Sequence, residues 1–196
     1  MAVPYINLTG INPSAKPSAN NWSASYSPTF RFQPPVSFLA YVKSRKEYKT
    51  ITSLDEIDAD GIYFYDGDLT FDSIPSQFNS YNVVLISLET VTINTDLNKT
   101  ADPNLKSIAI LAPTINFAPT VTQADGIFIA STVDTGATAN QGLKIVGNLI
   151  AQTSLINQRQ WSDPNRPVLF VVFDSKKYLD LLPYLSTAKY EWKQTQ

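Results

Sequence analysis

The sequence predicts an all-β fold, a right-handed parallel β-helix with short capping helices. Three stretches follow one template, which is an apolar-x-apolar triplet, a gap of four residues, and an apolar-polar-apolar triplet. Their first triplets start at Ile62, Val84 and Ile108, 22 residues (84 − 62) and 24 residues (108 − 84) apart, and a looser copy starts at Ile127, 19 residues later (127 − 108). Such periods are typical of solenoids, whose neighbouring coils stack to bury an apolar face that one coil cannot bury alone.

The template also separates this fold from its competitor, an antiparallel β-sandwich. Sandwiches have short alternating strands too, but they seldom repeat a two-part motif with the same internal gap. We therefore expect the apolar template positions to be buried in stacked columns: Ile62, Phe64, Leu69, Phe71, Val84, Ile86, Val91, Ile93, Ile108, Ile110, Ile115 and Phe117.

Composition excludes several classes of function. The chain has 15 Lys+Arg against 17 Asp+Glu, so it has no basic surplus to attract nucleic acid. It has no Cys and no His, which removes thiolate and imidazole catalysis and the usual ligands of zinc and iron–sulfur clusters, so we expect no cofactor. No apolar run approaches the roughly 20 residues that span a bilayer, and the first residues do not resemble a signal peptide. We expect no membrane insertion by this chain, and an exported parent protein would make it a fragment or a mature form.

The chain divides into a leader and a single solenoid domain. Residues 1–36 are rich in Pro, Ser and Asn, which predicts an irregular leader that wraps the core. Residues 37–196 form the solenoid domain. Its first part, residues 37–60, contains a short amphipathic pattern from Phe38 to Glu47 whose basic residues fall in the last turns, and it predicts an N-terminal cap helix.

The coils are expected over residues 61–160. Val, Ile, Thr, Phe and Tyr dominate this stretch, and turn residues such as Asp66-Gly67-Asp68 separate the runs. A fifth strand group covers residues 143–151. Residues 161–196 predict a C-terminal cap, made of a polar loop, an apolar strand from Val168 to Phe173 and a short helix around residues 176–182.

The order of these parts resembles a recurrent domain. The matching segments are Gly61-Ile62-Tyr63-Phe64-Tyr65-Asp66-Gly67-Asp68-Leu69-Thr70-Phe71, Asp125-Gly126-Ile127-Phe128-Ile129-Ala130, Gly147-Asn148-Leu149-Ile150-Ala151, Arg159, Tyr178-Leu179-Asp180-Leu181-Leu182-Pro183 and Tyr190-Glu191-Trp192. They are similar to the C-terminal β-solenoid domain of long exported envelope proteins from uncultured candidate-phylum bacteria, some of them described beside type IV pilus components. The resemblance spans residues 37–196, except that the acidic and Asn-rich run after the Arg is reduced here. It implies a cell-surface scaffold without catalytic residues.

Four carboxylates, Asp58, Asp60, Asp66 and Asp68, form the densest acidic group in the sequence. They could bind calcium or supply the acid and base of a glycosidase. The more ordinary interpretation is turn chemistry, in which Gly takes a positive φ and Asp caps backbone donors. We favour the second interpretation.

Three aromatic side chains are candidates for a binding surface. Tyr63, Tyr65 and Phe128 alternate with the expected core positions and would point outward, where with Asp66 and Asp68 they could contact a sugar or another protein unless the leader covers them. The basic residues Lys144, Arg159 and Arg166 match no catalytic spacing, and we expect Arg159 to pair with an acid or a carbonyl group.

These observations favour a non-catalytic structural or adhesive module, and the resemblance implies that it lies outside the cell or in its envelope. Its partners would be a surface polysaccharide or envelope proteins. The alternative is a carbohydrate-active β-helix, either a binder or a lyase. A groove that gathers Asp, Lys and Arg with exposed aromatics would favour the alternative.

Overall fold

The computed structural model describes residues 47–97, 106–163 and 165–185. The predicted leader and the cap helix that begins at Phe38 lie outside these ranges, so both stay predictions, as does the division of the chain at residue 36. Strands make up most of the regular secondary structure in these ranges. The elements are β1 (Lys49–Ile51), the 3-10 helix η1 (Leu54–Glu56), β2 (Gly61–Tyr65), β3 (Leu69–Phe71), α2 (Gln77–Ser80), β4 (Val83–Ser87), β5 (Thr90–Ile93), β6 (Ile108–Phe117), β7 (Gln123–Asp134), β8 (Leu143–Ile156), β9 (Leu169–Phe173) and α3 (Ser175–Leu185).

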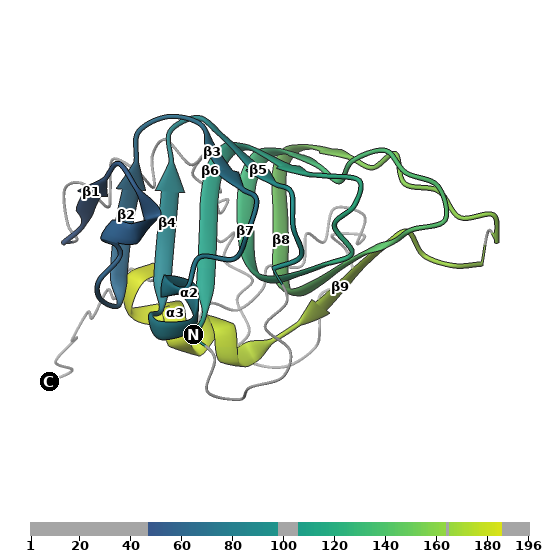
Figure 1. Ribbon diagram of the computed structural model, residues 1–196. Coiled ribbons are helices and arrows are strands. Elements are labelled where there is room, and N and C mark those ends of the chain that lie inside the picture. The colour runs from purple at the N-terminus through teal and green to yellow at the C-terminus, as the bar shows by residue number, and fades with distance from the viewer. Residues whose placement is uncertain (1–46, 98–105, 164, 186–196) are drawn as a thin grey trace, which may run out of the picture. The chain divides into compact units, whose positions relative to one another are not determined.

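The strands stack as a parallel β-solenoid, which confirms the predicted fold class (Figure 1). All the strand pairs are parallel, as stacked coils require. One side of the coils, here called the first face, contains β1, β2, β4, the first halves of β6, β7 and β8, and β9. The opposite side, the second face, contains β3, β5 and the second halves of β6, β7 and β8. The handedness of the winding stays a prediction.

On the second face the template is confirmed residue by residue. Leu69 is in register with Val91, and Val91 with Ile115. These side chains are buried between the two faces, and so are those of the parallel column Phe71, Ile93 and Phe117. Alternation predicted this face correctly because the residues between the columns, such as Thr70, are polar and point away from the interior.

On the first face the template is wrong by one residue in the third coil. Ile62 is in register with Val84, as predicted, but Val84 pairs with Ala109, and Ile108 pairs with Val83. The reason lies in β4, whose five residues are all buried. A parallel strand that is covered on both sides is apolar throughout, so its alternation no longer indicates which side chains point inward.

The apolar side chains form two cores instead of one. The larger core lies inside the coils and includes Tyr63, Leu85, Ile110 and Phe128. The smaller core lies on the outer side of the first face, where the side chains of Ile62, Phe64, Val84, Ile86, Ala109, Leu111 and Ile127 pack with Leu181 of α3. All twelve predicted positions are buried, but four of them, Ile62, Phe64, Val84 and Ile86, belong to this smaller core.

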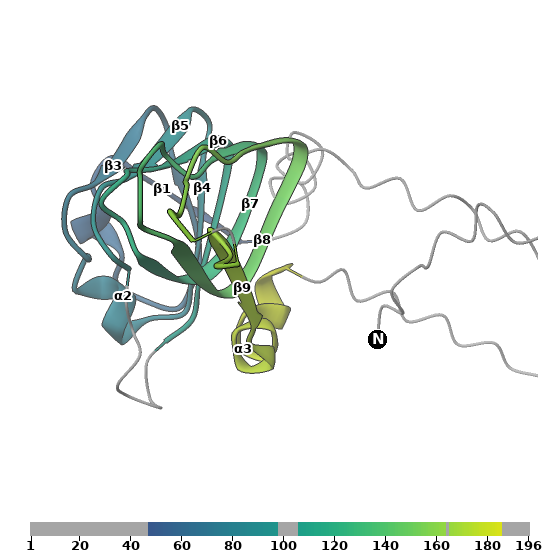
Figure 2. The ribbon, with the colours of Figure 1, turned by 90° about the vertical axis from the view of Figure 1, so that its right-hand side faces the viewer.

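The C-terminal residues extend the first face by one strand and cover its outer side. β9 adds a parallel strand to β8, and α3 crosses the outer side of the first face, where it contacts β4, β6, β7 and β8. Figure 2 shows α3 lying outside the coils, next to β9. The predicted strand and helix are thus present, and the helix covers the flank of the solenoid. In the ranges that the structure describes, no helix is long and apolar enough to cross a membrane.

Polar side chains tie successive coils together at the corners. Asp60 accepts hydrogen bonds from the backbone N–H (3.0 Å) and the side-chain amide (2.9 Å) of Asn82, one coil on. Asn82 in turn accepts from the backbone N–H of Ser107 at 2.9 Å. Asp68 accepts from the backbone N–H of Thr90 at 2.9 Å, and Asp72 accepts from the side-chain amide of Asn94 at 2.7 Å. The bonds from the backbone N–H groups of Asn82, Thr90 and Ser107 give partners to donors at the corners, and those from the side-chain amides of Asn82 and Asn94 add links between coils.

Replacing Ile86 with Ala is expected to lower the free energy of unfolding by about 2–5 kcal/mol, as deletion of a buried aliphatic side chain does. Ile86 is 5 % exposed and lies in the smaller core, in register with Phe64 and Leu111. Chemical denaturation of the two proteins measures the difference. A loss below about half a kcal/mol, the scale of a neutral surface substitution, would mean that this side chain is not packed under α3.

Candidate functional site

The four carboxylates of the predicted acidic cluster do not form one site. Asp58 and Asp60 precede β2, whereas Asp66 and Asp68 follow it, and the five residues of β2 separate the two corners by roughly 16 Å. Asp58 instead forms a salt bridge with Lys49 at 3.0 Å, which lowers the pKa of the carboxyl group, and Asp60 and Asp68 bond to the next coil. Among the described residues no group of three or more acidic side chains could hold a metal ion.

Calcium is therefore expected to leave the stability unchanged. Protein treated with EDTA and then supplied with calcium should melt at the same temperature as before, because Asp58, Asp60 and Asp68 already have partners within the fold and lie at two separate corners. Differential scanning calorimetry gives the answer directly. A rise of many degrees on adding calcium would restore the corner carboxylates as a binding site.

The expectation that three aromatic residues point outward is wrong for two of them. Tyr63 and Phe128 lie in the core inside the coils, at 3 % and 0 % exposure. The Tyr63 hydroxyl donates to the carbonyl oxygen of Ala59 at 2.8 Å, and the Phe128 ring packs edge-to-face on Phe117 at 5.4 Å. They were misassigned because both sides of the first face are apolar, so alternation gave the wrong side. Neither side chain is accessible to a partner.

The third aromatic, Tyr65, lines a groove at the first coil. Here β1 is followed by η1, and residues 52–55 line the groove together with residues 69–71 of β3. Ser53 begins η1 with a capping box: its side chain accepts from the Asp55 N–H at 3.3 Å, and Glu56 accepts from the Ser53 N–H at 2.9 Å. Glu56 also accepts from the backbone N–H and the hydroxyl of Thr52, and these bonds lower the pKa of its carboxyl group. The capping box fixes one wall of the groove.

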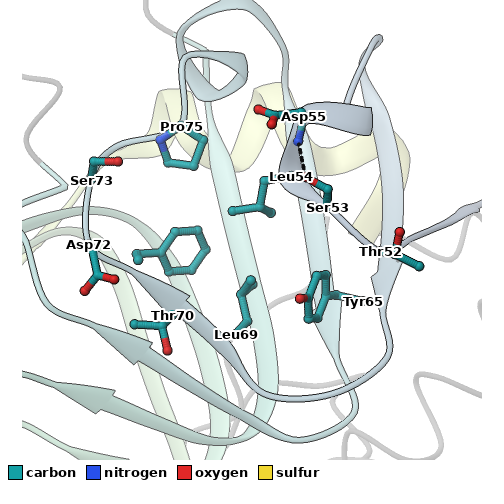
Figure 3. A pocket seen from close by; sticks show the side chains of 11 residues that line it. Thr52, Ser53, Leu54, Asp55, Tyr65, Leu69, Thr70, Asp72, Ser73 and Pro75 are labelled. Carbon is teal, nitrogen blue, oxygen red and sulfur yellow. Dashed lines mark hydrogen bonds between the residues drawn. The ribbon is translucent and has the colours of Figure 1, made fainter.

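The groove has a volume of about 390 Å³. Apolar side chains form its floor, and hydroxyl and carboxylate groups form its rim (Figure 3). The buried or half-buried side chains of Leu54, Tyr65, Leu69 and Phe71 make the floor, and the rim is made by Thr52, Ser53, Asp55, Thr70, Asp72 and Ser73, with Pro75 as its one apolar member. An aromatic ring beside hydrogen-bonding oxygens is a combination that suits the apolar and hydroxyl faces of a small sugar.

The two rim carboxylates each have an amide partner. Asp55 Oδ1 accepts from Gln77 Nε2 at 3.2 Å, and Asp72 Oδ1 accepts from Asn94 Nδ2 at 2.7 Å. These bonds fix one oxygen of each carboxylate and orient the other. The described residues that line the groove include no Lys or Arg, the side chains with which a lyase would neutralise an acidic sugar.

The basic candidates lie at the opposite end of the strand order. Arg159 is 3 % exposed and donates to three backbone carbonyls, those of Thr135 (2.6 Å), Ala118 (3.0 Å) and Gly142 (3.3 Å). The prediction that it pairs with carbonyl groups is confirmed. Burial lowers the pKa of its guanidinium group, and the charge of Asp96 acts in the opposite direction. Its role is to join three successive turns of the chain.

The other two basic residues are exposed. Lys144 lies on β8, and Arg166 stacks over the ring of Trp161 at 5.4 Å and lies 3.8 Å from Asp163. Neither residue lines the groove. The structure therefore does not bring Asp, Lys and Arg together at the groove that holds Tyr65.

Acid is expected to weaken the coil-to-coil bonds of Asp96. Burial tends to raise the pKa of this carboxyl group, but hydrogen bonds from Thr122 and Gln123 hold it below the usual value. The folded protein therefore binds this proton less readily than the unfolded chain. The resulting stability is present above about pH 4 and is lost as the pH falls through the lower, folded-state pKa. Melting temperatures between neutral pH and pH 3 should fall less steeply for Asp96→Asn than for the unsubstituted protein, and equal slopes would contradict this role.

The groove itself was missed by the sequence analysis. Its walls come from two segments, residues 52–55 around η1 and residues 69–75 from β3 onward, and their approach depends on the three-dimensional fold. One signal was present in the sequence, the Ser53-x-x-Glu56 capping box, which indicates a helix start and hence a break in strand stacking. No family model, curated protein or solved structure matches this chain.

Proposed function

We propose that this chain is a non-catalytic structural or adhesive β-solenoid module of the bacterial cell surface. The observation that carries the proposal is the use of polar side chains between coils. Asp60, Asp68, Asp72 and Asp96 accept hydrogen bonds from the coil that follows, and Arg159 is buried among carbonyl groups. These charged side chains thus bond the coils to one another, which is the role expected of scaffold residues.

The location and the partners rest on the resemblance to exported envelope proteins. The absence of Cys and His is compatible with a scaffold that needs neither disulfides nor metal. A surface polysaccharide or another envelope protein is the partner that such a module would contact.

Two measurements test this proposal. Antibodies raised against the purified chain should label intact cells of the source bacterium, and external protease should remove the signal. Purified protein incubated with neutral and acidic polysaccharides should release no new reducing ends and no unsaturated sugars. Labelling that requires permeabilised cells would contradict the location, and sugar release would contradict the non-catalytic role.

A second candidate function is carbohydrate binding in the groove. It is favoured by the arrangement of Tyr65 among the rim oxygens of Asp55 and Asp72. Cello-, chito- and xylo-oligosaccharides are suitable neutral probes because the described lining residues include two carboxylates and no cationic side chain. Tyr65→Ala should weaken binding of any oligosaccharide that the protein retains on an array. Tyr48→Ala is the matched control, since Tyr48 is an exposed aromatic residue that does not line the groove. Equal losses in both variants would exclude the groove.

A further inference from the structure

The last strand of the solenoid, β9, exposes an unusual run of apolar side chains. Phe170, Val171, Val172 and Phe173 are 49 %, 46 %, 43 % and 67 % exposed, respectively. β9 pairs along one edge with β8, and within the described ranges no strand pairs along its other edge. An exposed apolar edge strand is a template for pairing with another strand.

The two ends of the first face differ in how their edges are protected. β1, at the other end, has only three residues and begins with Lys49, which forms a salt bridge with Asp58. Short length and an edge lysine are devices by which proteins prevent edge pairing. β9 has five residues and contains neither a charge nor a proline. A head-to-tail chain of molecules would require β1 as the acceptor, so this asymmetry favours pairing between two β9 strands.

We propose that β9 pairs antiparallel with β9 of a second copy, so that two solenoids join at their C-terminal ends in a two-fold dimer. A two-fold axis perpendicular to the sheet leaves each side chain on the same side of the sheet in both copies. Residues that lie directly opposite each other in an antiparallel pair also point to the same side. The axis must therefore pass beside one residue, which then lies opposite its own copy. With Val171 at the axis, all five residues of β9 are paired. Val171 then faces its own copy, Phe170 faces Val172, and Leu169 faces Phe173.

This register is self-complementary on both sides of the sheet. Leu169 and Val171 lie beside the buried Leu143 and Ile145 of β8, so their side of the dimer extends the core inside the coils. On the other side, each Phe170 meets a β-branched partner. Aromatic and β-branched pairs are among the favourable cross-strand combinations, and no like charges oppose each other within the five-residue overlap.

Substitutions at the two-fold axis test the proposal with the full-length chain. Sedimentation equilibrium should give a dimer mass, twice the 21.7 kDa of the chain, at micromolar concentrations. Val171→Lys and Val171→Glu should each be monomeric, because each would place two like charges opposite one another. A one-to-one mixture of the two variants should recover the dimer, since opposite charges then meet at the axis. Thermal melting of each variant alone checks that it remains folded.

Thr50→Lys is the matched control. Thr50 is the exposed central residue of β1, the edge strand at the other end of the first face, and its substitution should leave the dimer intact. A monomeric parent protein would overturn the proposal. So would a dimer that survives Val171→Lys, or a mixture of the Lys and Glu variants that stays monomeric while both are folded. Loss of the dimer in Thr50→Lys would indicate head-to-tail stacking instead.

Discussion

A chain that stops after Gln160 is expected to aggregate or to unfold without a cooperative transition. The stop removes β9 and α3, and with α3 it uncovers the smaller core on the outer side of the first face. That surface carries Ile62, Phe64, Val84, Ile86, Ala109, Leu111 and Ile127, each at most 5 % exposed in the intact protein. Apolar surface of this extent on parallel strands is rarely left in contact with water.

A pair of substitutions within α3 isolates the role of the helix. Leu181 is fully buried against the first face, whereas Leu179, two residues earlier, is 68 % exposed. Leu181→Ala should lower the free energy of unfolding by about 2–5 kcal/mol, and Leu179→Ala should change it by less than about half a kcal/mol. For the chain that stops after Gln160, size-exclusion chromatography measures aggregation and calorimetry measures the cooperativity of unfolding. A truncated chain with an unchanged melting curve and no aggregation would show that α3 is an appendage.

Gly147→Ala is expected to be the most destabilising single substitution, with a loss of at least about 3 kcal/mol. Gly147 has φ +135°, and a Cβ atom added there would lie 2.1 Å from the carbonyl oxygen of Gly126, its neighbour in the preceding coil. The obstacle is backbone, which cannot move aside as a flexible side chain does. Two stacked glycines thus allow the backbones of β7 and β8 to approach closely at this level of the first face.

The chain provides a matched control for this substitution. Gly67 has a similar φ of +123°, but an added Cβ would meet nothing within 4 Å. Gly67→Ala should therefore cost only the backbone strain, about 1–3 kcal/mol. Urea denaturation of both variants measures the difference between them, which is the cost of the clash between coils. Equal losses would mean that the close approach of Gly147 to Gly126 does not matter for stability.

The second face was predictable from the sequence because one side of it is apolar and the other polar. Thr70 and Thr92 alternate with Leu69, Val91 and their neighbours, so the phase of the pattern indicates the interior directly. The first face was not predictable in the same way. β4 is buried on both sides, and nothing in Val83-Val84-Leu85-Ile86 distinguishes the side inside the coils from the side under α3.

The same ambiguity explains the outcome for the candidate residues. Tyr63 and Phe128 were assigned to the surface by alternation, but a tyrosine can lie in a core when its hydroxyl finds partners, here at Ala59. Arg159 was predictable because a single arginine beside a corner needs acceptors. The groove was not predictable, since it depends on how closely the segment around η1 approaches β3 in the folded chain.

Distances between labels in one column of the second face test the stacked coils most directly. The chain has no Cys, so pairs of introduced cysteines are the only sites for spin labels. Thr70, Thr92, Asn116, Asp134 and Ile156 occupy one register column on consecutive strands. With one label at Thr70→Cys and the second at Thr92→Cys, Asn116→Cys or Ile156→Cys, the separation measured by electron paramagnetic resonance should grow by about 4.8 Å with each coil. Separations that do not increase in this order would contradict the parallel solenoid on which the two cores, the groove and the free edge of β9 all depend.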